Sequence, residues 1–159
     1  MRCDPTPNSQ DVLGAKVMVA SSPQPVGGHY RVCTLPLMVS RIAAGFPSPA
    51  DDYVEKQIDL NTHLIQHREA TFILRVSGWS MRDAGIFDGD EIIVDRAITP
   101  VDGKIVVAAI NGELTVKRLR HVGESVHLLA ENPDFPVIIL KEGEELCIWG
   151  VVTRVLHSV

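Results

Sequence analysis

The sequence predicts a mainly β fold, a small and strongly bent β-sheet domain that follows a flexible N-terminal arm. Three observations predict it: short runs of β-branched residues recur through the second half of the chain, turn residues separate these runs, and the first 35 residues are rich in proline and glycine without any regular period. With 159 residues and 45% apolar content, the chain is long enough for one domain with a core.

We place the arm at residues 1–44 and the domain at residues 45–159. Residues 1–35 have the composition of a mobile segment, because prolines and glycines stand among Ser, Thr and Gln. The apolar segment LPLMVSRIAAGF at residues 35–46 interrupts this polarity. The arm therefore carries one segment that could dock on another surface.

A short helix is expected at the start of the domain, in IDLNTHLIQH at residues 58–67. Leu60, Leu64 and Ile65 fall near one face of such a helix, and Asp59 is a suitable N-cap residue.

The rest of the chain predicts six or seven short strands. In chain order they are TFILRVS, EIIVDR, KIVVAAI, ELTVKRL, VHLLAE, VIIL and LCIWGVVTRVL. Asn111-Gly112 joins the third and fourth runs, and Asn-Gly between two apolar runs is a strong hairpin signal.

The distribution of charge argues against nucleic acid as a direct partner. Residues 1–44 carry four basic and two acidic residues, a net of +2, which leaves −7 of the total of −5 on residues 45–159. Nucleic-acid affinity comes largely from Lys and Arg on phosphates. We therefore expect protein partners and no direct sequence-specific DNA binding.

Cysteine usage and hydropathy suggest a reducing, non-membrane setting. Cys3, Cys33 and Cys147 are odd in number and form no C-x-x-C pair, so reduced thiols are expected. No window approaches the roughly 20 apolar residues of a membrane span, and the first ten residues hold an acid and two prolines where a signal peptide is apolar. We expect a cytoplasmic protein without membrane contact.

The bend SGWSM places Ser80 directly after a predicted strand and before the turn-rich GIFDGD. A serine hydroxyl is a poor nucleophile until a base takes its proton. None of the six histidines lies in a recognisable triad motif, and His63 and His67 have Leu64 where a zinc protease needs Glu. No metal site is predicted.

Apart from the histidines, the candidate for the base is Lys117, in the predicted strand GELTVKRL. Alternation along a strand puts Glu113, Thr115, Lys117 and Leu119 on one face. At an ordinary pKa near 10.4, only about 4 in 10,000 lysines are neutral at pH 7, so a lysine base needs a lowered pKa. Desolvation in a packed β core could lower the pKa to about 8, which would reduce the stability of the fold by roughly 3 kcal/mol.

Three pieces of the chain carry a family resemblance: SGWSM with GIFDGD, GELTVKRL, and AAGFPSPADDYVE. Together they resemble the LexA/UmuD family of self-cleaving serine peptidases, and its UmuD-like members above all, from about Gly45 to Val152. The resemblance implies a LexA C-terminal-like peptidase domain with a Ser-Lys dyad, in which Ser80 is the nucleophile and Lys117 the general base.

The resemblance also assigns the scissile bond to Ala44-Gly45. A small pocket suffices for Ala44, and Gly45 lets the backbone approach the serine closely.

Further roles follow from the same resemblance. Backbone N–H groups of Ser80 and Trp79 would hold the oxyanion, Thr115 would orient the lysine amine, and Met81 would pack beneath the serine.

The family also implies partners and a biological role. Self-cleavage would be stimulated by the RecA filament on single-stranded DNA in the bacterial SOS response to DNA damage. The body left after loss of residues 1–44 would be a homodimer that joins a UmuC-like translesion DNA polymerase. No cofactor is implied.

Three alternative interpretations assign the chain to a different class of protein. A LexA-type repressor needs a helix-turn-helix, which 44 residues rich in proline and glycine cannot build. A signal peptidase shares the Ser-Lys chemistry but needs a membrane segment. A non-catalytic dimeric module that binds a polymerase stays open, because a processed body could act without further catalysis.

Overall fold

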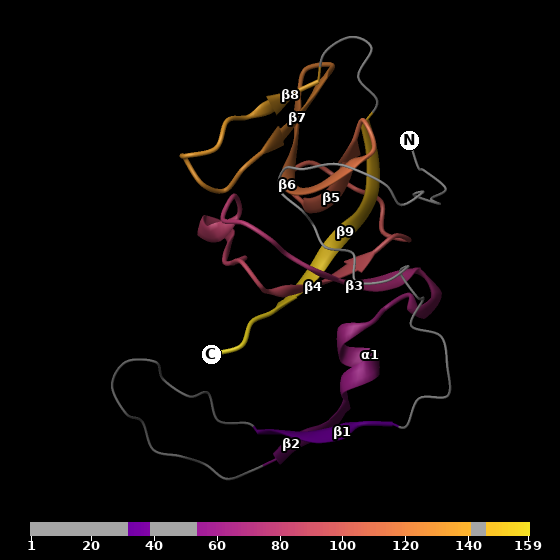
Figure 1. Cartoon of the computed structure of the whole chain (residues 1–159). Coiled ribbons are helices and arrows are strands. Elements are labelled where there is room, and N and C mark those ends of the chain that lie inside the picture. The colour runs from indigo at the N-terminus through magenta and orange to yellow at the C-terminus, as the bar shows by residue number, and fades with distance from the viewer. Residues whose placement is uncertain (1–31, 39–53, 141–145) are drawn as a thin grey trace. The chain divides into compact units, whose positions relative to one another are not determined.

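The computed structural model describes residues 32–38, 54–140 and 146–159, which fall into two compact units (Figure 1). One unit lies within residues 27–66, and the other contains all described residues from His67 onward.

The smaller unit is a β-hairpin-like pair followed by one helical turn. Strand β1 (Thr34–Met38) pairs antiparallel with β2 (Val54–Asp59), which leads directly into α1 (Leu60–Leu64). The side chain of Asp59 accepts a hydrogen bond from the N–H of Asn61 at 3.1 Å. The predicted helix and its N-cap are therefore confirmed, although the helix is shorter than its sequence run.

The two strands of this unit were not predicted. Pro36 lies within β1, and proline is tolerated only at the edge of a sheet, a condition that a two-stranded sheet meets. The β2 sequence VEKQID has no alternation of apolar and polar residues to mark it as a strand. The expected boundary between residues 44 and 45 lies in 39–53, outside the described residues.

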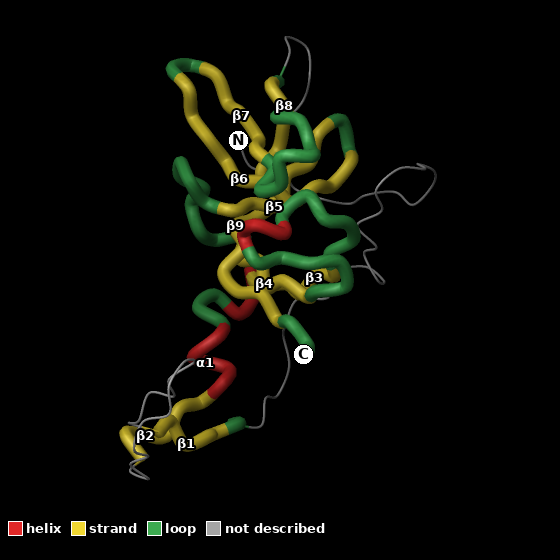
Figure 2. Tube along the Cα trace, turned by 90° about the vertical axis from the view of Figure 1, so that its left-hand side faces the viewer, coloured by secondary structure: helices red, strands yellow, loops and turns green. Residues whose placement is uncertain are grey.

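The larger unit is one antiparallel sheet, and all seven strand runs predicted here are confirmed. The strands are β3 (Thr71–Arg75), β4 (Glu91–Asp95), β5 (Ile105–Ile110), β6 (Glu113–Val122), β7 (Ser125–Leu129), β8 (Ile138–Ile139) and β9 (Leu146–Leu156). Their order across the sheet is β3-β4-β9-β5-β6-β7-β8. Strands dominate this unit, with short helical turns between them (Figure 2).

Strand β9 holds the sheet together although it is last in the chain. Residues 146–151 of β9 pair with β5, and residues 151–156 pair with β4 (Figure 1). The register shifts at Ile93/Val94 and at Val107/Ala108, and such irregularities bend a sheet. The expectation of a strongly bent sheet is thus met.

The predicted Asn-Gly turn joins β5 to β6. Asn111 and Gly112 have φ of 50° and 87°, the left-handed pair that a type I′ turn requires.

Two apolar clusters cover the sheet. Adjacent residues of β5 belong to different clusters, Val107 to one with Phe72 and Trp149, and Val106 to one with Leu128. Successive strand side chains point to opposite faces, so the sheet is packed on both. The β3–β4 region and the bend after β3 contribute to the first cluster.

One expectation about cysteines was wrong. Cys33 is free and exposed, but Cys147 is in a disulfide rather than a reduced thiol. Cysteine count and spacing do not show which thiols the fold brings together.

Among the described residues, no helix is long and apolar enough to cross a membrane.

Candidate active site

The bend that carries Ser80 is held by the loop that follows it in sequence. The Val76 N–H donates to the Asp90 carbonyl at 2.8 Å, and the Gly89 N–H donates to the Val76 carbonyl at 2.9 Å. The Asp88 carboxylate accepts a hydrogen bond from the Gly78 N–H at 2.7 Å. The motifs SGWSM and GIFDGD therefore form one hydrogen-bonded structure, in which the Asp88 carboxylate of the second motif holds the backbone of the first.

The backbone of the bend depends on glycine at its start. Gly78 has φ of 97°, a conformation that glycine adopts without the steric cost other residues incur. After Ser80 the chain enters the short 3₁₀ helix η2 (Arg82–Ala84), which Gly85 ends at φ 75°. The hydroxyl of Ser80 is thus presented between a left-handed glycine and a helical turn.

Strand β6 brings Lys117 to this hydroxyl. The Nζ atom of Lys117 lies 2.8 Å from Oγ of Ser80 and 3.1 Å from Oγ1 of Thr115. It also donates to the Val116 carbonyl at 2.9 Å. An ammonium group can donate to all three oxygens, whereas a neutral amine donates to two of them and can accept the proton of the Ser80 hydroxyl.

The environment of the amine favours its neutral form. Lys117 is only 7% exposed, and desolvation by burial lowers its pKa from the ordinary value. Its three hydrogen-bond partners are uncharged oxygens, so none of them offers the countercharge that would stabilise the ammonium. A neutral amine here can accept the hydroxyl proton of Ser80.

Two backbone donors at the bend have no acceptor among the described residues. Within the described part of the chain, neither the Trp79 N–H nor the Ser80 N–H donates a hydrogen bond. The carbonyl of Trp79, in contrast, accepts from the side chain of Asn132 at 2.9 Å and, at the longer distance of 3.4 Å, from the Arg82 N–H. Backbone N–H groups without an acceptor beside a nucleophile can receive a developing oxyanion.

The residues on either side of Ser80 have opposite environments. Met81 is 2% exposed and packs in the apolar cluster with Ile86. Trp79 is 53% exposed, and its ring meets the edge of Phe87 with centroids 6.3 Å apart. Met81 therefore anchors the bend in the core, while Trp79 presents an apolar surface to solvent.

The predicted scissile residues Ala44 and Gly45 lie outside the described residues, so the structure does not relate them to Ser80.

Among the residues that the structure does describe, no cluster of His, Cys, Asp or Glu could hold a metal ion. His67 instead contacts the buried carboxylate of Asp95, with Nδ1 and Oδ2 2.7 Å apart.

Some residues that shape the site were not singled out from the sequence. Asp88 and Asn132 stood only in turn segments, FDGD and NPDFP, and Glu131 ended a predicted strand. Turn composition shows where the chain reverses but not which backbone group a side chain will bind. The Asp-Gly and Asn-Pro pairs were the available signals, and they did not distinguish these roles.

Comparison with protein families identifies the class of protein. A family model described as Peptidase S24-like matches residues 36–153, most of the chain. The chain therefore belongs to this family of serine peptidases, and within it to the UmuD-like proteins of the LexA/UmuD group.

Individual relatives agree with this assignment. Protein ImpA of Escherichia coli is 47% identical over 123 residues, which cover 77% of this chain and 83% of ImpA. Protein MucA of Salmonella typhimurium is 46% identical over 130 residues, covering 81% and 88%. The LexA repressor of Cupriavidus taiwanensis is 45% identical over 125 residues, which cover 79% of this chain but 57% of the repressor.

Proposed function

We propose that the chain is a self-cleaving serine endopeptidase in which Ser80 is the nucleophile, Lys117 is the general base and Ala44-Gly45 is the bond cut. The observation that carries the proposal is the contact of 2.8 Å between the buried Lys117 amine and the Ser80 hydroxyl. If Ser80 were only a turn residue and Lys117 only a solvent-exposed strand residue, their side chains would not be expected to lie within hydrogen-bond distance.

The proposed chemistry has two stages. In the first, the Ser80 hydroxyl proton passes to neutral Lys117 while Oγ attacks the carbonyl carbon of Ala44. The resulting tetrahedral intermediate collapses, the C–N bond to Gly45 breaks, and the lysine ammonium gives its proton to the departing amine. In the second, Lys117 takes a proton from water while the water oxygen attacks the carbonyl carbon of the acyl ester. The bond from that carbon to Oγ then breaks, and the lysine ammonium returns its proton to Oγ, which releases Ser80 and the Ala44 carboxyl group.

Neighbouring groups have supporting roles in this proposal. The Trp79 and Ser80 N–H groups would hold the oxygen of the tetrahedral intermediate, and the Thr115 hydroxyl would keep the amine directed at Oγ. Because the substrate segment belongs to the same polypeptide, a tether would raise its effective concentration at the site.

The biological role proposed is that of an SOS mutagenesis protein in the bacterial cytoplasm. The RecA filament on single-stranded DNA would stimulate cleavage by favouring the conformation in which the arm is docked. Residues 45–159 would then act as a homodimer and accessory subunit of a UmuC-like translesion polymerase. Membership of the UmuD-like group supports this role.

The test is intact-mass spectrometry of the full chain after incubation with RecA, ATP and single-stranded DNA. Two new masses that correspond to residues 1–44 and 45–159 are expected, and the Ser80→Ala and Lys117→Ala variants should remain whole. Cleavage of either variant at the wild-type rate would remove that residue from the mechanism. Gly45→Trp should block cleavage at this bond, and cleavage of this variant at the wild-type rate would contradict its assignment.

A further inference from the structure

The loop between β7 and β8 reaches the serine bend through Asn132. This side chain is 4% exposed, and its Nδ2 donates to the Trp79 carbonyl at 2.9 Å. Its Oδ1 accepts from the Asp134 N–H at 3.0 Å, and its own carbonyl accepts from the Phe135 N–H at 3.1 Å. Both ends of the side-chain amide are therefore hydrogen-bonded, and it cannot turn without breaking one of these bonds.

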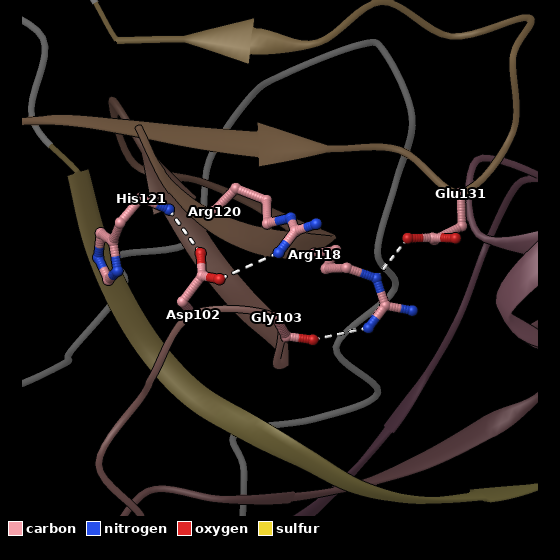
Figure 3. A network of polar contacts seen from close by, with 6 residues as sticks. All are labelled: Asp102, Gly103, Arg118, Arg120, His121 and Glu131. Carbon is pink, nitrogen blue, oxygen red and sulfur yellow. Dashed lines mark hydrogen bonds and ion pairs between the residues drawn. The ribbon is translucent and has the colours of Figure 1, made fainter. Parts of the chain in front are cut away.

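The preceding residue, Glu131, joins the same loop to the strand of the lysine. Its carboxylate pairs with the guanidinium of Arg118, which follows Lys117 in β6, and Arg118 also donates to the Gly103 carbonyl at 2.6 Å (Figure 3). The Glu131 carbonyl accepts from the N–H of Asp83 at 2.9 Å. Because Asp83 lies in η2 just after the serine, Glu131 and Asn132 connect the element of the base to the element of the nucleophile.

We infer that Asn132 is a positioning residue that sets the direction of the peptide unit between Trp79 and Ser80. In a trans peptide the C=O and the N–H point in opposite directions, and the described residues contain no cis peptide bond. A hydrogen bond that fixes the Trp79 carbonyl thus also fixes the Ser80 N–H, which has no acceptor among the described residues. The inference rests on the proposed function, since it gives this N–H the oxyanion as its acceptor.

The size of the expected effect follows from geometry. Removal of one oxyanion donor lowers the rate of acyl transfer roughly 10²- to 10³-fold, and a displacement of about 1 Å can cost 10²-fold. Without Asn132 the Trp79 carbonyl keeps, among the described residues, only the longer hydrogen bond from the Arg82 N–H at 3.4 Å. The N–H of Ser80 is then misdirected rather than deleted, so a loss of about 10²-fold is expected. The base itself is untouched, because the contacts of Lys117 are with Ser80, Thr115 and Val116.

The discriminating variant is Asn132→Asp, which keeps the acceptor for Asp134 but has no N–H for the Trp79 carbonyl. Asn111→Asp is the matched control, because it makes the same chemical change in the exposed β5–β6 turn, where aspartate also suits the backbone. Asn132→Ala serves as a second variant that removes the donor without adding a buried charge.

Two rates are measured on the full chain between pH 7 and 11. One is self-cleavage by intact mass, and the other is labelling of Ser80 by an alkyl fluorophosphonate, which does not require the arm to dock. In labelling, the Oγ–P bond forms, the P–F bond breaks, fluoride leaves and Lys117 takes the hydroxyl proton. Thermal unfolding of each variant is recorded alongside.

For Asn132→Asp and Asn132→Ala we expect the plateau of both rates to fall about 10²-fold, while the apparent pKa of each profile stays at the wild-type value. Asn111→Asp should match the wild type. Rates within threefold of wild type in either folded variant would overturn the inference, and so would an apparent pKa that moves toward that of an ordinary lysine, since that result indicates general loosening of the site. A wild-type chain that neither cleaves nor labels would instead overturn the proposed function, and the inference with it.

Discussion

The amine of Lys117 and the hydroxyl of Ser80 lie 2.8 Å apart although 37 residues separate them in sequence. The bend after β3 supplies one group and the middle of β6 the other, and Lys117 is buried where they meet. Because burial lowers the pKa of this lysine, both the rate of the proposed reaction and the stability of the fold should depend on its protonation.

The first prediction concerns the rate. Self-cleavage should rise about tenfold per pH unit below the lowered pKa of Lys117 and level off above it, because only the neutral amine can accept the serine proton. The measurement is intact mass over time between pH 7 and 11, with far-UV circular dichroism to show that the chain stays folded. A flat profile between pH 7 and 10 would exclude Lys117 as the base.

The second prediction concerns stability. The folded state loses the Lys117 proton at a lower pH than the unfolded state, so between the lowered pKa and the ordinary value of 10.5 the unfolded chain binds more protons. The free energy of unfolding should therefore rise with pH in that window, by at most about 1.4 kcal/mol per pH unit, and gain nothing further above it.

The measurement is urea unfolding of Ser80→Ala, which the proposed mechanism leaves unable to cleave itself, against the double variant Ser80→Ala with Lys117→Met. Methionine has a similar length and no titratable group, so the difference between the two curves isolates the lysine. If both variants show the same dependence on pH, the amine is not desolvated in solution.

Much of the larger unit could be predicted from its sequence because local signals and packing agree there. The β-branched runs became β3 to β9, and Asn111-Gly112 became the left-handed turn between β5 and β6. Strands β1 and β2 escaped prediction because their pairing compensates for a proline and for weak patterning. Register shifts in β4, β5 and β9 likewise depend on partners far away in sequence.

The candidate site shows the same division. Alternation along β6 predicted that Thr115 and Lys117 lie on one face, and the Thr115 hydroxyl does contact the Lys117 amine. The prediction that Ser80 approaches that face rested only on the resemblance to a family. No rule of sequence spacing relates a bend to a strand 37 residues later. The support from Asp88 and Asn132 could not be predicted, because each binds a backbone group that only the folded bend presents.

The third prediction tests the role of the Thr115 hydroxyl. Thr115→Val keeps the shape of the side chain but removes the oxygen 3.1 Å from the Lys117 amine. Loss of one such hydrogen bond is worth about 1 kcal/mol, so the plateau rate of cleavage should fall roughly five- to tenfold as the amine becomes less well directed. Thr115→Ser keeps the hydroxyl and should stay within about twofold of wild type. Equal rates for the valine and serine variants would show that the hydroxyl does not orient the base.

The fourth prediction tests the backbone of the bend. At Gly78 the φ of 97° is unfavourable for any residue with a Cβ, yet an added Cβ would meet no atom within 4 Å. The strain of Gly78→Ala is therefore conformational rather than a clash, and it should lower the free energy of unfolding by about 1–3 kcal/mol. If the bend relaxes to relieve this strain, the Ser80 hydroxyl moves away from Lys117, and we expect cleavage to slow by at least tenfold.

Gly123→Ala provides the comparison, because Gly123 also has positive φ, at 62°, and also has open space around its Cβ position, but it lies in the turn between β6 and β7. That variant should lose stability while its cleavage rate, measured well below its melting temperature, stays at the wild-type value. A Gly78→Ala chain that is destabilised but cleaves as fast as Gly123→Ala would mean that the left-handed glycine serves folding alone, and that other contacts hold the serine against its base.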